Sequence, residues 1–119
     1  NNFKTEWAIE KVKNASLQFK IENDRDAIIA CMGLAFKPNI DDLRESPALH
    51  VAEQLETDGF KVLFVEPNLK SHRNFNLTSI EEAEEACDIM VFLVAHKEFK
   101  GLVAPPQARV MDFCGILNS

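Results

Sequence analysis

The segment Gly33–Ala48, which reads GLAFKPNIDDLRESPA, decides how this chain folds. It follows the short apolar run Ala27–Met32, which is typical of a strand covered on both faces of a parallel sheet. It ends where a helix can begin, because Ser46 is a good N-cap and Pro47 suits the first helical position. The segment is therefore predicted to be a loop that leads from a buried strand to a helix N-terminus.

A loop of this kind is a favourable place for an anion. Free backbone N–H groups and the helix dipole attract negative charge, and ligands of open α/β sheets gather at the carboxyl ends of the strands. Lys37 and Arg44 add positive charge to this loop, in a protein whose net charge is −6. We expect a phosphorylated ligand here. The alternative is that both are surface cations paired with the nearby carboxylates of Asp41, Asp42 and Glu45.

The rest of the chain predicts strands that alternate with helices. The expected strands cover residues 27–32, 61–65, 89–94 and 108–113, and the expected helices cover residues 5–20, 47–58 and 79–87. The last of these helices opens with a capping box, Ser79 to Glu82. Apolar strands in this order are typical of an α/β protein with a doubly wound parallel sheet in three layers, α/β/α. The helix over 5–20 is the one element that could belong to a neighbouring domain.

Composition limits the classes of function. A chain of 119 residues with 46% hydrophobic content suits one domain, and the acidic balance argues against nucleic acid or a membrane as the main partner. No apolar run approaches the roughly 20 residues of a membrane span. The odd number of cysteines (Cys31, Cys87 and Cys114) fits buried thiols in a reducing cytoplasm. Because the first residue is Asn1 rather than Met, we expect a piece of a longer protein.

Two residues near the expected strand ends are candidates for ligand contact. Glu66 stands where a ribose-binding acid would follow the second strand, but the chain has no G-x-G-x-x-G, so we interpret Glu66 as a carboxylate in solvent. His96 follows the most apolar strand and is the best placed of the three histidines. No histidine has metal-ligand spacing, and no paired nucleophile is evident. We therefore expect neither a metal site nor a catalytic residue in this chain.

The loop also carries a family resemblance. Residues 33–37 (GLAFK) and 42–47 (DLRESP) resemble the G-hydrophobic-A/S-F/Y-K and T-x-D-x-R-E-S segments in the C-terminal domain of the UDP-glucose/GDP-mannose dehydrogenase family. Within that family, the sequence of residues 31–48 (CMGLAFKPNIDDLRESPA) most resembles bacterial UDP-N-acetyl-D-mannosamine dehydrogenases. Residues 96–100 (HKEFK) resemble the same branch, and residues 2–14 resemble the end of its linking helix.

The resemblance implies a Rossmann-like fold, a division of the chain and three residue roles. Residues 1–22 would be the end of the linking helix, and residues 23–119 the UDP-sugar-binding domain. Phe36 and Lys37 would contact the UDP part of the substrate. Arg44, oriented by its acidic neighbours, would reach an NAD cofactor that is bound mainly by a domain upstream.

The resemblance also implies an activity for the whole enzyme. It would oxidise UDP-N-acetyl-D-mannosamine to UDP-N-acetyl-D-mannosaminuronate for surface polysaccharide synthesis, with two NAD, and would act as a homodimer or larger homo-oligomer. This fragment alone would be inactive. UDP-glucose is an alternative substrate, and a non-catalytic module that binds an anion or a partner is the alternative of another class.

Two positions depart from the family pattern. Ile40 replaces the usual Thr, and Cys114 stands where the family has an Arg or Lys that helps to hold the substrate. Arg109, Lys97 or a neighbouring chain could supply the missing charge; otherwise the nucleotide sugar would bind less tightly.

Overall fold

Four parallel strands form the centre of the molecule. The computed structural model describes residues 4–118. Its sheet has the order β2-β1-β3-β4, with β1 (Ile28–Met32), β2 (Lys61–Val65), β3 (Ile89–Phe92) and β4 (Arg109–Asp112). The predicted parallel sheet is confirmed. The third strand ends two residues earlier than expected, because the N–H groups of Leu93 and Val94 both turn to the carbonyl of Met32 at the end of β1.

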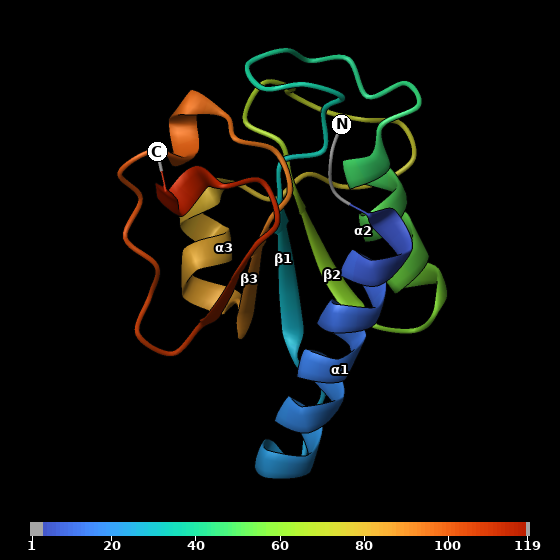
Figure 1. The fold of residues 1–119 in the computed structure, drawn as a ribbon, viewed down its shortest axis with the longest axis vertical. Coiled ribbons are helices and arrows are strands. Elements are labelled where there is room, and N and C mark those ends of the chain that lie inside the picture. Colours follow the sequence, from blue (N-terminus) through green and yellow to red (C-terminus); the bar gives the residue numbers. More distant parts are fainter. Residues whose placement is uncertain (1–3, 119) are drawn as a thin grey trace.

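Helices cover both faces of this sheet, as predicted. Helices α1 (Thr5–Asn23) and α2 (Pro47–Thr57) lie on one face, and α3 (Ile80–Ala86) lies on the other (Figure 1). Two short 3-10 turns, η1 (Lys97–Phe99) and η2 (Ile116–Asn118), flank β4 in the chain. Among the described residues, no helix combines the length and the apolar content that a membrane crossing requires.

Alternate residues of β1 point to opposite faces of the sheet. Ile29 and Cys31 join the core beneath α1 and α2, whereas Ala30 and Met32 join the core beneath α3. All four side chains are fully buried. This double coverage explains why the strand reads as an unbroken apolar run rather than as an alternating pattern.

Two helices begin at the caps that the sequence predicts. The Ser46 hydroxyl accepts the N–H of Leu49 at 3.2 Å, and Pro47 is the first residue of α2. At α3, Ser79 and Glu82 form the reciprocal capping box. Helix α1 packs through one apolar face, with Ala8, Val12 and Ala15 buried in the core beneath α1 and α2.

The strand order places a topological switch point between β1 and β3. The chain leaves β1 for α2 on one face, whereas β3 continues toward β4 by way of η1, whose buried Phe99 packs in the core of the opposite face. The two connections diverge and leave a crevice above the strand ends, where ligands of such sheets bind. Gly33 lies at this point with φ +96°, and a Cβ built on it would lie 2.7 Å from the Cβ of Val94. The two strand ends approach so closely that only glycine fits.

Replacing Gly33 with alanine should therefore destabilise the fold strongly. The new methyl group would overlap Val94 in a backbone conformation that disfavours side chains, so we expect G33A to lower the free energy of unfolding by about 2–4 kcal/mol. G59A is the matched control, because Gly59 has φ +93° but nothing within 4 Å of its built Cβ; it should cost only about 1–2 kcal/mol. Urea unfolding measures both. Equal losses would show that the contact with Val94 contributes nothing.

Candidate functional site

A cavity of about 430 Å³ opens at the carboxyl ends of the strands, at the switch point. Three connections line it: residues 35–38 after β1, residues 93–95 after β3 and residues 113–114 after β4. Ala48, in the first turn of α2, completes the wall. The cavity thus lies against the loop that the sequence singles out, where an open α/β sheet binds its ligands.

The structure brings two of the three predicted site residues together. Phe36 and Lys37 both line the cavity, and the Lys37 ammonium lies 6.0 Å from the centre of the Phe36 ring. Phe36 is 43% exposed, although its backbone N–H donates to the carbonyl of Asp42 at 2.8 Å. Arg44 is not among the lining residues, and its side chain is 88% exposed. It belongs to the same loop but lies apart from the cavity.

The Asp42 carboxylate holds the Arg44 guanidinium in a bidentate ion pair. The carboxylate accepts from Nε at 3.0 Å and from Nη2 at 2.9 Å, and it also accepts the backbone N–H of Arg44 at 2.9 Å. The guanidinium lowers the pKa of Asp42 to about 2. Asp42 orients Arg44 as predicted, and the contact closes the end of the loop that precedes α2.

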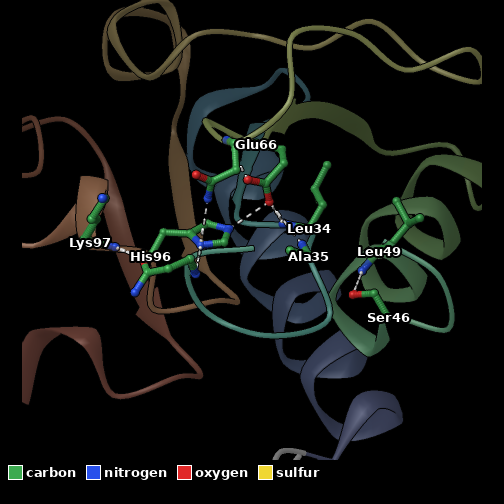
Figure 2. Close-up of polar contacts among 9 residues, drawn as sticks. Leu34, Ala35, Ser46, Leu49, Glu66, His96 and Lys97 are labelled. Atoms are coloured by element: carbon green, nitrogen blue, oxygen red, sulfur yellow. Dashed lines mark hydrogen bonds and ion pairs between the residues drawn. The ribbon is translucent and has the colours of Figure 1, made fainter. Parts of the chain in front are cut away.

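Glu66 is buried, so its interpretation as a solvated carboxylate is wrong. It is only 2% exposed, and its Oε1 accepts the backbone N–H groups of Leu34 at 2.8 Å and Ala35 at 3.1 Å (Figure 2). Oε2 accepts the N–H of Asn68 at 2.9 Å. Burial alone would raise the pKa of Glu66, but the hydrogen bonds from His96, Leu34 and Asn68 outweigh it and hold that pKa below its usual range.

His96 is fully buried beside Glu66 and does not line the cavity. Its Nε2 lies 2.9 Å from Oε1 of Glu66, and its Nδ1 accepts the backbone N–H of Asn39 at 2.8 Å (Figure 2). A backbone N–H only donates, so Nδ1 carries no proton, and Nε2–H donates to Glu66. The ligand-contact role expected for His96 is therefore wrong. His96 follows β3, next to the end of β1, and therefore lies beneath the loop 33–46, where it contacts Asn39.

The loop and its surroundings match one known protein family over most of the chain. The model of the "UDP-glucose/GDP-mannose dehydrogenase family, UDP binding domain" matches residues 30–119. This chain belongs to the UDP-glucose/GDP-mannose dehydrogenase family. It is 38% identical over 122 residues to UDP-N-acetyl-D-mannosamine dehydrogenase of Campylobacter jejuni, covering 96% of this chain and 28% of that protein. It is 42% identical over 109 residues to the enzyme of the same name from Escherichia coli K12, covering 84% of this chain and 26% of that protein.

Solved structures of the family show the same fold. A UDP-N-acetyl-D-mannosamine dehydrogenase from Pyrococcus horikoshii superimposes with a TM-score of 0.65 at 28% identity, covering 87% of this chain and 26% of that one. GDP-mannose dehydrogenase from Pseudomonas aeruginosa, solved as a ternary complex, gives a TM-score of 0.68 at 24% identity, covering 90% of this chain and 30% of that one. The chain thus spans less than a third of the length of these relatives.

An uncharged residue, Cys114, stands where the resemblance implies a cation. Cys114 lines the cavity, and burial raises the pKa of its thiol to about 11, so it carries no charge at neutral pH. Arg109 pairs with Ile89 at the amino ends of the strands, the edge of the sheet opposite the cavity, so it does not replace the family's cation. Lys97 lies closer, because its N–H donates to Oδ1 of Asn39 in the loop at 2.7 Å.

The titration of Asp42 tests how Arg44 is held. R44A should raise the pKa of Asp42 from about 2 toward the ordinary value of about 3.9. The lowered pKa means that Asp42 supports the loop above about pH 4 and loses this contribution as the pH falls toward 2. Carboxyl carbon shifts measured by NMR would follow the change, with R73A, on an exposed arginine of another loop, as the control. A pKa still near 2 in R44A would mean that the backbone N–H alone lowers it.

Proposed function

We propose that this chain is the nucleotide-sugar-binding domain of an NAD-dependent UDP-sugar 6-dehydrogenase, and that UDP-N-acetyl-D-mannosamine is the sugar nucleotide. The observation that carries the proposal is the cavity at the switch point, lined by Phe36 and Lys37 in a chain of this family. Relatives that are 38–42% identical bear the name UDP-N-acetyl-D-mannosamine dehydrogenase, which favours this sugar over glucose.

The chemistry of the cavity suits a nucleoside diphosphate. Lys37 is a free cation there, since no carboxylate within the described range 4–118 lies at ion-pair distance from its ammonium. An ammonium binds phosphate by charge-assisted hydrogen bonds. Phe36 offers a half-exposed aromatic ring beside it, which can pack against a base or ribose. The volume, about 430 Å³, is within the usual range of ligand pockets.

The remaining parts of the reaction are assigned to the rest of the polypeptide. NAD would accept the hydride, and this chain has no G-x-G-x-x-G turn to bind the pyrophosphate of the cofactor. What it offers is Arg44, which is exposed, held by Asp42 and not among the residues that line the cavity, as a contact for a cofactor bound by the rest of the polypeptide. In the same proposal, α1 is the end of a linking helix; residues 1–3 lie outside the described part. The enzyme is a homodimer or a larger homo-oligomer.

Removing the Lys37 ammonium should weaken the binding of UDP. In the full-length polypeptide that carries this chain, K37A should raise the Kd of UDP by about 10- to 100-fold, because one charge-assisted hydrogen bond to the diphosphate is lost. It should leave weak binding of uridine unchanged, because uridine has no phosphate. K61A, at the amino end of β2, is the control and should bind UDP normally. Calorimetry gives each Kd. If K37A binds UDP as the wild type does, Lys37 does not contact the diphosphate.

Arg44 should affect the cofactor rather than the sugar nucleotide. In the same polypeptide, R44A should raise the KM for NAD about tenfold and leave the Kd of UDP within about twofold, because the guanidinium lies outside the cavity. Steady-state kinetics with NAD varied at saturating UDP-sugar provides the measurement. An unchanged KM for NAD, or a change confined to UDP, would remove Arg44 from the cofactor site.

A further inference from the structure

We propose that Glu66 and His96 are positioning residues for the nucleotide site: together they hold the loop 33–46 in the shape that presents Phe36 and Lys37 to the cavity. We call this buried pair the Glu66–His96 clamp. The nature of the ligand rests on the proposed function, whereas the clamp itself rests on contacts within the structure.

The clamp contacts the loop on both sides of the ligand-binding residues. Before Phe36, the backbone N–H groups of Leu34 and Ala35 donate to Oε1 of Glu66 at 2.8 and 3.1 Å. After Lys37, the N–H of Asn39 donates to Nδ1 of His96 at 2.8 Å. Figure 2 shows Glu66 between the His96 ring and the backbone of Leu34 and Ala35, with dashed lines to these residues. Residues 36–38 are therefore a short bridge whose two ends are both fixed.

A second contact holds the far end of this bridge. Asn39 has the left-handed backbone conformation (φ 64°), and its Oδ1 accepts the N–H of Lys97 at 2.7 Å. One residue of the loop is thus tied to the β3–β4 connection through both its main chain and its side chain. The loop cannot move away from the strand ends without breaking both bonds.

The polar atoms of the clamp are already occupied by protein partners. Oε1 of Glu66 accepts three hydrogen bonds, Oε2 accepts the N–H of Asn68, and both ring nitrogens of His96 have partners. Glu66 is 2% and His96 0% exposed, and neither lines the cavity. They can influence a bound ligand only through the loop. Removing the acceptor of a loop N–H leaves that donor unpaired in a buried site, and this releases the loop segment that the bond holds.

Two substitutions at His96 separate its two contacts. H96N keeps an acceptor near the position of Nδ1 and loses the contact with Glu66; H96Q can still place a donor near Glu66 and loses the acceptor for Asn39. H50Q, on the exposed face of α2, is the control for changing a histidine. The experiment measures amide exchange by NMR in this chain, and the Kd of UDP together with kcat in the full-length polypeptide, below the melting temperature of every variant.

The clamp predicts different results for the two variants. In H96Q the Asn39 amide should exchange about tenfold faster or more, while the β1 amides keep their protection, and the Kd of UDP should rise about tenfold. In H96N both quantities should stay within about threefold of the wild type. Recovery by H96N distinguishes positioning from simple filling of space, because the smaller Asn side chain leaves more empty volume than Gln does.

Three results would overturn the proposal. The first is an Asn39 amide that exchanges equally in H96Q and the wild type; the second is equal UDP affinity in H96Q and the wild type. If the wild-type polypeptide itself does not bind UDP, the proposed function fails, and the exchange of the Asn39 amide still decides whether the clamp holds the loop. If H96N and H96Q lose protection equally across β1, His96 acts only as packing and the proposal is wrong.

Discussion

The structure depends on how the backbone is satisfied where β1 ends. The N–H of Gly33 still donates to the carbonyl of Val65 on β2, but the next two donors, on Leu34 and Ala35, have passed the end of the ladder. An unpaired N–H at a buried position costs about 1–3 kcal/mol. The carboxylate of Glu66 accepts both donors, and in return they stabilise a buried negative charge. Burying the two N–H groups without the carboxylate, or the carboxylate without the N–H groups, would cost free energy.

This arrangement explains how the fold differs from a dinucleotide-binding sheet. In that fold, a glycine-rich turn after the first strand lets the backbone approach a pyrophosphate, and the acid after the second strand binds a ribose. Here the backbone N–H groups after β1 bind the protein's own acid, which occupies the equivalent place after β2. Donors that are already bonded to Glu66 are not available to a ligand. The positive charge for a ligand must therefore come from further along the loop, where Lys37 lies.

Local sequence patterns predict most of the fold, whereas they do not predict the Glu66–His96 clamp. The apolar run of β1 and the caps at Ser46 and Ser79 each depend on neighbouring residues, so a short window of sequence reveals them. Glu66 and His96 are 30 residues apart, and each looks ordinary by itself. Their meeting depends on the strand order, which puts the ends of β2 and β3 on either side of β1. Local patterns carry no such information, so they indicate a solvated acid at Glu66 where the structure has a buried acceptor.

The register of β4 explains why Arg109 does not supply positive charge at the cavity, which leaves that role to Lys37. Arg109 is only three residues before Asp112, yet the pairing of β4 with β3 places it at the edge of the sheet opposite the cavity. Asp112 lies at the cavity end of β4, where its carboxylate accepts the N–H groups of Cys114 and Gly115. Two further carboxylates that contact the loop are likewise bonded, Asp42 to the Arg44 guanidinium and Glu66 to the clamp. Although the chain is acidic overall, the carboxylates of Asp42, Glu66 and Asp112 are therefore already paired or hydrogen-bonded. The Lys37 ammonium is left unneutralised, and a local excess of positive charge can form in a protein whose net charge is −6.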